Sequence, residues 1–370
     1  METRSLRLGE LFSGPGGLAL GAVNATSRAD NVTLKIRHVW ACDIDSSACE
    51  TYRCNICRDV DSQRVICTDV RELNINDLGS IDVFAYGFPC NDFSIVGEHK
   101  GVVGKYGRLY YYGVKVLNFF KPIVFVAENV GGIHSANNGK AFQQILSDLE
   151  SAGDGYNLTV HLYKSEQYGV PQTRHRYIIV GFRRDTRLFF KVPAPTHIEK
   201  YVTAKEALSN IPTAAKNNER ARTTAKVIER LKQIKPGENA WTADLDKHLR
   251  LNVKAVKLSH IYRRLQPDKP SYTITGSGGG GTHVYHYHDP RPLTNRERAR
   301  LQSFPDEFYF CGSREQVRKQ IGMAVPPKLS TVIFTAILHT LNGVEYSSVP
   351  ANFPYHSAPS TLWEFRSPSD

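Results

Sequence analysis

A thiol, a carboxyl group and two guanidinium groups stand at the ends of apolar runs in this sequence. Cys90 follows one run within Gly87-Phe88-Pro89-Cys90, Glu128 ends a second, and Arg174 and Arg176 open a third. Ligands of α/β sheets bind beyond the ends of strands. A thiol can attack a substrate, a carboxyl group can move a proton, and a guanidinium group can hold an oxygen atom. The set therefore predicts covalent catalysis at the mouth of a sheet.

A plainer interpretation exists for the cysteine taken alone. A single cysteine is usually a small buried apolar residue. Glu128, however, would be costly at the end of a buried strand unless it bound something. Because the thiol, the carboxyl group and the two arginines belong together by chemical type, we expect a catalytic cluster with Cys90 as its nucleophile.

A glycine-rich turn, Ser13-Gly14-Pro15-Gly16-Gly17, joins an apolar run to a helical pattern. Glycine lets a ligand approach the backbone closely, and the start of a helix can receive a pyrophosphate or a carboxylate. Asp43, which follows the next apolar run, could accept hydrogen bonds from both ribose hydroxyls. The spacing departs from the Gly-x-Gly-x-x-Gly dinucleotide pattern. The turn alone therefore indicates a nucleoside-type ligand without naming it.

Seven apolar runs have the length and composition of strands. They cover residues 6–12, 36–42, 64–67, 83–86, 123–127, 158–163 and 177–182. Because helical patterns separate several of these runs, we expect an α/β fold with a mostly parallel sheet covered on both faces.

The character of the sequence changes near residue 186, where prolines and then a basic stretch interrupt the alternation. Helical periodicity returns at 294–302 and 329–341, and the end of the chain is rich in Ser and Pro, which predicts an irregular tail. We therefore expect four parts. They are a catalytic and cofactor-binding domain at 1–188, a smaller second lobe at 189–290, a hinge helix and return segment at 291–345 that completes the first domain, and a tail at 346–370.

The formal net charge of the 370-residue chain is +11, and its pI is about 9.2. This surplus favours a polyanionic partner, because neutralising phosphates releases counterions. No apolar run reaches the roughly 18 residues that span a bilayer, and the start of the chain lacks a signal-peptide stretch. We therefore expect neither a membrane protein nor a secreted one.

The seven cysteines lack an export signal and are expected to be free thiols. Four lie close together (Cys49, Cys54, Cys57 and Cys67), and His283, His286 and His288 alternate with other residues. Either group could hold a metal if its side chains converged. The plainer interpretations are a cysteine-containing helix and a β-ribbon beside a ligand, and we expect no metal.

Six segments together resemble the C5-cytosine DNA methyltransferases, of the kind found in prokaryotic restriction-modification systems, in order, spacing and residue type. The likeness extends from about residue 6 to residue 342 and thins out between about 186 and 270. The matching segments are Phe12-Ser13-Gly14-Pro15-Gly16-Gly17, Gly87-Phe88-Pro89-Cys90, Glu128-Asn129-Val130, Gln172-x-Arg174-x-Arg176, Arg291-Pro292-Leu293-Thr294-x-Arg296-Glu297 and Gln320-Ile321-Gly322-Met323-Ala324-Val325-Pro326-Pro327.

The resemblance implies a catalytic role for four residues. The thiolate of Cys90 would add to C6 of a cytosine turned out of the duplex, and Glu128 would bind its N3/N4 edge and handle the proton at N3. Arg176 would hold O2, and Arg174 would bind the adjoining backbone or brace Glu128. C5 would then take a methyl group, and a base, expected to be water, would remove the C5 proton.

The resemblance also implies S-adenosylmethionine as methyl donor, S-adenosylhomocysteine as product, and a Rossmann-like methyltransferase fold whose second lobe recognises the target. Phe12 would pack on the adenine, Asp43 would bind the ribose, and Asp69, otherwise interpreted as a helix N-cap, would bind the adenine amino group. The full set of cofactor-binding candidates is Phe12, Ser13, Gly14, Gly16, Gly17, Asp43, Ile44, Asp69, Val70, Pro89, Leu109, Met323 and Ala324.

Two residues depart from the family pattern. The family usually has Gln where this chain has Asn91, and Asn where it has Met323. These differences affect contacts near the flipped base and in the cofactor pocket or between the lobes. Neither replaces the nucleophile or the acid.

The implied partner is double-stranded DNA, bound by a monomeric, cytoplasmic and nucleoid-associated prokaryotic enzyme, with a cognate restriction endonuclease acting at the same site as a further partner. Three alternative functions fit these residues less well. An RNA cytosine-5 methyltransferase would not need so long a variable segment for reading base edges. A catalytically silent DNA-binding protein would not need Cys90, Glu128 and Arg176, and a nicotinamide oxidoreductase would leave Cys90 and the arginine pair unexplained.

Overall fold

The computed structural model describes residues 2–57, 64–89, 109–133, 139–251, 260–277 and 279–355. Cys90, the expected nucleophile, and Asn91 lie outside these ranges. Within them, the main element is a sheet of order β2-β3-β1-β5-β6-β8-β7, with β4 paired to β3. Its strands are β1 (Glu2–Leu11), β2 (Thr26–Ala29), β3 (Val32–Asp43), β4 (Val65–Cys67), β5 (Val83–Gly87), β6 (Val124–Val130), β7 (Tyr156–Lys164) and β8 (His175–Arg183).

The centre of the sheet is parallel and its two ends are not. Strands β4, β3, β1, β5 and β6 run parallel to their neighbours, whereas β2, β8 and β7 pair antiparallel. The mostly parallel α/β fold predicted from the sequence is confirmed. The strand β2 was not predicted, because its sequence Thr-Ser-Arg-Ala has no apolar run.

Two layers of helices cover the sheet. On one face, α1 (Gly17–Asn24), α2 (Ser46–Ile56) and α9 (Pro327–Leu341) pack against alternate strand residues such as Val83 and Ala85. On the other face, α3 (Leu109–Phe120) and α4 (Lys140–Ser151) pack against Phe84 and Phe125. This alternation is the two-residue period of strands that are buried on both faces.

The helix α9 is a core helix that returns to the sheet from the far end of the chain. A Cβ atom at Gly21 would lie 2.3 Å from the Cβ of Ser330, so glycine lets α1 and α9 cross closely. The stretch Arg314–Leu341 is long and apolar enough to cross a membrane, with a mean hydropathy of 1.6 in its most apolar window. Because 72% of that window is buried in the structure, its apolar character is explained by the core.

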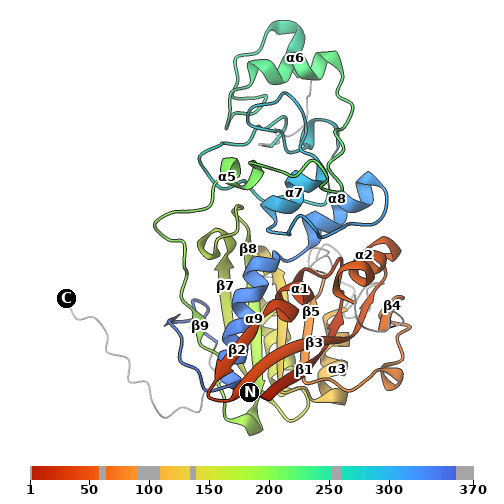
Figure 1. Cartoon of the computed structure of the whole chain (residues 1–370), viewed down its shortest axis with the longest axis vertical. Helices are drawn as coiled ribbons and strands as arrows, with labels where there is room; N and C mark the ends of the chain where they lie inside the picture. Colours follow the sequence, from red (N-terminus) through yellow and green to blue (C-terminus); the bar gives the residue numbers. More distant parts are fainter. Residues whose placement is uncertain are drawn as a thin grey trace, which may run out of the picture.

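A smaller lobe stands beyond one edge of the sheet (Figure 1). It contains α5 (Ala204–Leu208) and α6 (Ala225–Gln233), and α7 (Asn295–Leu301) and α8 (Arg314–Met323) lie between it and the sheet. Little of it is regular, and two small apolar clusters form its core. The buried guanidinium group of Arg264 supplies donors that strands would otherwise provide. It donates to five backbone carbonyls, those of Leu231, Ile234, His286, Tyr287 and His288.

The histidine-rich stretch is not a β-ribbon. Around it, Tyr285 forms only isolated bridges to Arg264 and Pro292. The capped turns at His286 and the carbonyls held by Arg264 supply the backbone contacts that a ribbon would have provided.

The first part of the predicted tail is irregular except for one two-residue strand, and it packs against the sheet. β10 (Ser348–Val349) pairs with β9 (Val192–Pro193), and the ring of Phe353 packs edge-on against Phe142. The amide of Asn352 accepts from the backbone N–H of Leu162 and donates to its carbonyl, at 2.8 and 3.1 Å. Because β7 is an edge strand, these bonds cover part of an edge that would otherwise be open.

A buried carboxyl group lies in the core beneath the glycine-rich turn. Glu10, on β1, is 1% exposed and accepts a hydrogen bond from the Tyr52 hydroxyl, which also contacts His38. Burial raises the pKa of Glu10 to about 8, and the Tyr52 hydrogen bond opposes that rise. Glu10 is therefore mostly protonated at neutral pH in the folded protein.

This buried acid predicts a pH-dependent stability. The folded state holds a proton that the unfolded state has released, so the contribution of Glu10 to stability falls as pH rises from about 4.5 to about 8. Glu10→Gln keeps the shape and removes the titration. Between about pH 6 and pH 8, the free energy of unfolding of the variant should rise relative to that of the wild type by up to about 3 kcal/mol, as measured by thermal unfolding. A stability difference that did not change with pH would contradict this account.

Candidate active site and cofactor pocket

Glu128 lies at the end of β6, directly beside the segment that leads to Cys90. Its register partner across the sheet is Gly87 on β5, and a Cβ atom at Gly87 would lie 3.1 Å from Oε2 of Glu128. The side-chain amide of Asn129 donates to the carbonyl of Phe88 at 2.9 Å. The structure thus anchors the chain three and two residues before Cys90 against the end of β6.

Arg176 forms an ion pair with Glu128 in which Nε lies 2.8 Å from Oε1, and each side chain is only 12% exposed. Burial raises the pKa of Glu128, and the charges of Arg176 and Arg174 oppose that rise. A carboxyl group with a raised pKa holds a proton more readily, which suits proton transfer to a ring nitrogen. The pair brings together two of the four predicted catalytic side chains.

Arg174, the neighbouring arginine, binds backbone carbonyls of two distant segments. It is 2% exposed, and it donates to the carbonyls of Ile274 and Ala324, at 3.2 and 3.0 Å. Burial and the neighbouring Arg176 lower its pKa to about 9. It acts on Glu128 through its charge alone, because no hydrogen bond joins the two side chains in the described structure. Its guanidinium group instead links β8 to the return segment.

The glycine-rich turn is held by Asp43. The Asp43 carboxylate accepts from the backbone N–H of Gly14 at 2.7 Å and from that of Asp45 at 2.9 Å. Gly16 caps α1 with a φ of 94°, a conformation that favours glycine, and a Cβ atom at Gly17 would lie 2.3 Å from the carbonyl oxygen of Val325. These contacts make a tight turn that only small residues can form.

The turn has unfilled polar capacity. The hydroxyl of Ser13 is buried and has no hydrogen-bond partner in the described structure. Each Asp43 oxygen accepts one hydrogen bond and retains a second lone pair. A Cβ atom at Gly14 would meet nothing within 4 Å. A ligand with hydroxyl and charged groups therefore fits the donors and acceptors of this turn.

The other cofactor candidates fall into three groups. Ile44 and Met323 are 68% and 66% exposed, so their apolar side chains are free to cover a ligand. Val70 is buried beside a cavity of about 180 Å³, whereas Phe12, Pro89 and Leu109 are half-buried. Asp69 and Ala324 are already engaged. Asp69 ion-pairs with Arg71 in a turn rather than capping a helix, and the carbonyl of Ala324 accepts from Arg174.

The sequence model of the C-5 cytosine-specific DNA methylase family matches residues 6–339 of this chain. The chain belongs to this family. The methylase is 59% identical over 358 residues to the type II methyltransferase M.BbvI of Brevibacillus brevis, covering 95% of this chain and 96% of that protein. It is 45% identical over 327 residues to M.NgoFVII of Neisseria gonorrhoeae, covering 86% and 82%. The predicted class, DNA (cytosine-5-)-methyltransferase, is confirmed.

The fold comparison agrees with the family. A crystal structure of a DNA modification methyltransferase encoded within an Escherichia coli prophage superposes with a TM-score of 0.68 at 24% identity. The superposition covers 91% of this chain and 99% of that one. At this identity the likeness supports the Rossmann-like architecture of the methylase and nothing finer.

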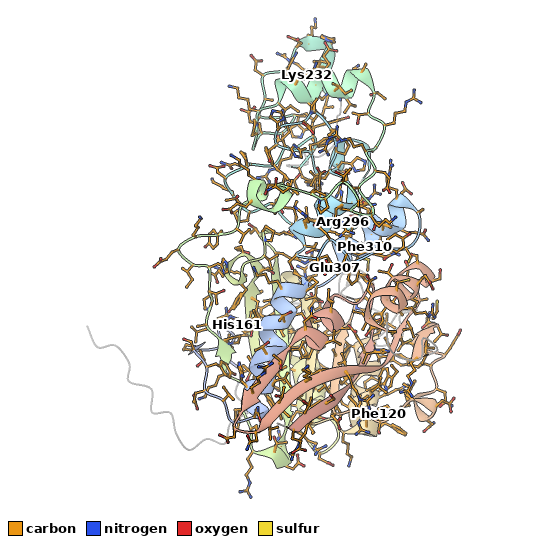
Figure 2. The ribbon with its side chains drawn as sticks, viewed as in Figure 1. Phe120, His161, Lys232, Arg296, Glu307 and Phe310 are labelled. Carbon is orange, nitrogen blue, oxygen red and sulfur yellow. The ribbon has the colours of Figure 1, made fainter. Side chains whose placement is uncertain are left out.

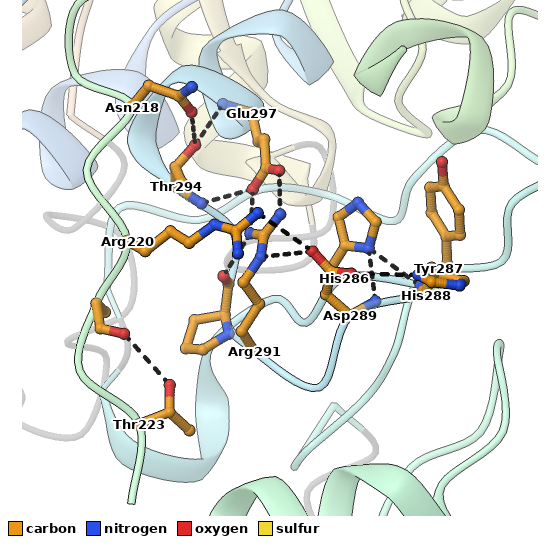
Figure 3. A network of polar contacts seen from close by, with 12 residues as sticks. Asn218, Arg220, Thr223, His286, Tyr287, His288, Asp289, Arg291, Thr294 and Glu297 are labelled. Carbon is orange, nitrogen blue, oxygen red and sulfur yellow. Dashed lines mark hydrogen bonds and ion pairs between the residues drawn. The ribbon is translucent and has the colours of Figure 1, made fainter. Parts of the chain in front are cut away.

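A polar network surrounds the start of α7 in the methylase (Figure 3). Thr294 and Glu297 form a capping box, and Glu297 also binds Arg291 through both carboxylate oxygens at 2.7 Å. Thr294 further donates to Asn218. Asp289 continues the network by pairing with Arg291 and, at 3.6 Å, with the exposed Arg220. The network joins the basic stretch near residue 218 to the hinge helix.

Arg296 is a positioning residue whose partners the sequence could not reveal. Its guanidinium group donates to the carbonyls of Lys216, Pro305 and Phe308. Figure 2 shows it beside Phe310, between the sheet and the outer end of the small lobe that Lys232 marks. The motif Arg296-Glu297 was recognised, but the three carbonyls are scattered over about 90 residues of sequence.

The described residues contain no group of three His, Cys, Asp or Glu side chains arranged to hold a metal. Cys54 faces Cys311, with the two sulfur atoms 3.8 Å apart, whereas Cys49 and Cys57 are buried in the core. His286 accepts hydrogen bonds from the backbone N–H groups of His288 and Asp289. These contacts account for the clustered cysteines and histidines in structural terms.

The placement of Arg174 predicts a loss of stability when it is replaced. Arg174→Met would leave the buried carbonyls of Ile274 and Ala324 without donors, at a cost of about 1–3 kcal/mol each. Chemical unfolding should detect this loss, whereas Arg187→Met, at an exposed arginine, should change little. If Arg174→Met unfolded like the wild type and only raised KM for DNA, Arg174 would act on the substrate instead of stabilising the fold.

Proposed function

We propose that this methylase transfers a methyl group from S-adenosylmethionine to C5 of a cytosine turned out of duplex DNA, through a covalent bond to Cys90. The observation that carries the proposal is the buried Glu128–Arg176 pair, which lies beside Gly87 and so next to the segment ending in Cys90. The family assignment and the relatives favour DNA as substrate over RNA, and catalysis over silent DNA binding.

The chemistry requires activation of C5, which is a poor nucleophile. The Cys90 thiolate adds to C6, and Glu128 gives or shares a proton at N3, so that C5 gains electron density. Arg176 holds Glu128 in place and offers its remaining donors to O2 of the ring. C5 would then take the methyl group, and S-adenosylhomocysteine would be the leaving group. Water, acting as a base, would remove the C5 proton, and the electron pair left at C5 would expel the Cys90 thiolate from C6 while the proton at N3 returns to Glu128.

The free energy lost when the base leaves the stack has to be offset by contacts to the rest of the duplex. Unstacking a base costs a few kcal/mol, and phosphate contacts offset that cost. The small lobe, about residues 189–290, supplies a surface of this kind because it is basic and bears few regular elements. We propose that it reads the target sequence.

The cofactor pocket is formed by the glycine-rich turn and Asp43. S-adenosylmethionine would supply an electrophilic methyl group when bound. Asp43 would accept from the ribose hydroxyls, Ser13 would give its unpaired hydroxyl to the methionine part, and Phe12 and Ile44 would cover the adenine. Gly14 and Gly16 keep the turn open, while Met323, Ala324, Pro89 and Leu109 would border the methyl-donor end. Asp69 would have to exchange Arg71 for the adenine amino group.

The biological setting follows from the relatives. The proteins M.BbvI and M.NgoFVII are named type II methyltransferases. We propose that this methylase likewise protects prokaryotic host DNA from a cognate restriction endonuclease. It would act as a monomer on DNA in the cytoplasm, among the nucleoid.

The nucleophile is tested by replacing Cys90. Cys90→Ser should abolish methyl transfer from labelled S-adenosylmethionine while duplex binding is retained, because serine is far less nucleophilic than a thiolate. Near-normal turnover in this variant would exclude the mechanism. DNA carrying 5-fluorocytosine should trap a covalent adduct on the wild type but not on the variant, because fluorine cannot leave as a proton does.

The cofactor contact is tested at Asp43. Asp43→Ala should weaken S-adenosylmethionine binding by about 1.5–3 kcal/mol for each charge-assisted hydrogen bond lost, as measured by calorimetry. Asp154→Ala, at an exposed aspartate paired with Lys121, provides a matched control that should bind normally. Equal affinity in the two variants would place the ribose elsewhere.

A further inference from the structure

The charged side chains in and beside α7 are almost all ion-paired or hydrogen-bonded to carbonyls. Glu297 binds Arg291, Arg300 binds Asp306, and each of the three guanidinium nitrogens of Arg296 donates to a carbonyl. Arg300 also donates to three carbonyls, those of Ala207, Ser209 and Asn210. A buried arginine in this helix is therefore normally provided with acceptors.

Arg298 is the exception on the same helix. It is 3% exposed, and the side-chain hydrogen bond that the described structure gives it is a long one, 3.5 Å from Nη2 to Nδ1 of His283. Burial and the neighbouring Arg318 lower the pKa of Arg298 to about 10, which still leaves it charged at neutral pH. No carboxylate of the described residues pairs with it.

Arg318, on α8, is a second arginine that has an unsatisfied donor. Its Nε atom is buried and has no hydrogen-bond partner in the described structure. Burial, Arg298 and Arg318 together lower the pKa of His283 to about 4. His283 is therefore neutral and can accept the hydrogen bond from Arg298 but cannot balance either charge.

Two guanidinium groups and a neutral imidazole thus share a partly buried site without an acid. A buried charge that lacks a partner is costly, and a second like charge adds to the cost. An anion bound between the two arginines would remove both penalties. A phosphate diester suits such a site, because its two free oxygens match the forked donors of guanidinium groups.

We propose that Arg298, Arg318 and His283, the α7–α8 cation site, bind a backbone phosphate of the DNA substrate. The proposal rests on the proposed function and adds a phosphate contact that positions the duplex at the junction of the lobes. Arg318, which is half-buried, would touch the phosphate, and Arg298 would lie behind it, held by His283.

The position of the α7–α8 cation site favours DNA over the cofactor as the source of the anion. Adjacent helical residues point about 100° apart. Lys319 pairs with Asp45, at the start of α2 and next to the cofactor turn, so Arg318 faces a different side of α8. His283 follows a glycine-rich stretch of the small lobe, and Cβ atoms at Gly279 and Gly280 would meet nothing within 4 Å. A nucleic-acid backbone can approach where that space is open.

The test compares two variants that lose the same charge. Arg318→Gln removes the proposed phosphate contact, and Lys35→Gln removes an exposed charge on β3 that has no assigned role. Binding of a short mixed-sequence duplex is followed by fluorescence anisotropy across a salt series, with S-adenosylhomocysteine present. Each phosphate contact contributes about 0.9 to the slope of log affinity against log salt.

We expect Arg318→Gln to reduce that slope by about 0.9 and to weaken binding severalfold at low salt, while Lys35→Gln matches the wild type. The unliganded Arg318→Gln protein should unfold at the same or a higher temperature, since one unpaired charge is gone. This result would show that weaker binding is not caused by misfolding. Arg318→Lys should keep most of the slope, because it keeps the charge.

Two outcomes would overturn the proposal. Equal slopes for Arg318→Gln and Lys35→Gln would mean that no phosphate is bound there. Weaker S-adenosylhomocysteine binding by calorimetry, with an unchanged DNA slope, would assign the α7–α8 cation site to the cofactor carboxylate. Absence of both duplex binding and methyl transfer in the wild type would contradict the proposed function itself, which is a separate failure.

Discussion

The ion pair between Glu128 and Arg176 is the interaction on which the arrangement of the active site depends. A carboxyl group at the end of a central strand has lost most of its water, and the 2.8 Å contact to Arg176 replaces it. The contact requires that β8 run antiparallel to β6, since only then does the start of β8 reach the end of β6. The register places Arg176 opposite Val130, two residues beyond Glu128.

The segment that leads into β8, from Gln172 to Arg176, also connects the two lobes. Gln172 accepts from the backbone N–H of Ile274 and donates to the carbonyl of Leu301, and Arg174 donates to Ile274 and Ala324. One short segment therefore places Arg176 beside Glu128 and fixes the chain where it returns from the small lobe. A shift of the lobe would be transmitted to the site through these bonds, because buried polar contacts have few alternative arrangements.

The small lobe is organised by arginines rather than by a sheet. Arg264 and Arg296 each collect several carbonyls from segments that are distant in sequence, and in this way they satisfy backbone groups that regular structure would have paired. Against that background, the buried Arg298 and the half-buried Arg318 differ: Arg298 makes one long hydrogen bond to His283, and Nε of Arg318 has no acceptor in the described structure. The contrast is physical: the first kind of arginine holds the fold, and the second kind leaves charge available to a ligand.

The sequence by itself was sufficient to predict the family, the α/β class and most strands, because each depends on local patterns. Apolar runs marked seven of the strands, and motifs around Gly14, Glu128 and Arg176 carried the chemistry. What escaped prediction was short or polar, such as β2, or depended on distant partners, such as the docking of Asn352 on β7.

Only the tertiary structure decided the roles of residues whose partners lie far away in the chain. Arg174 and Arg176 are two residues apart and chemically identical, yet one meets Glu128 and the other meets the carbonyls of Ile274 and Ala324. Residues two apart in an extended chain point to the same face, so spacing alone does not separate the two arginines. The direction of β8, and the segments that the fold brings against its start, separated the two.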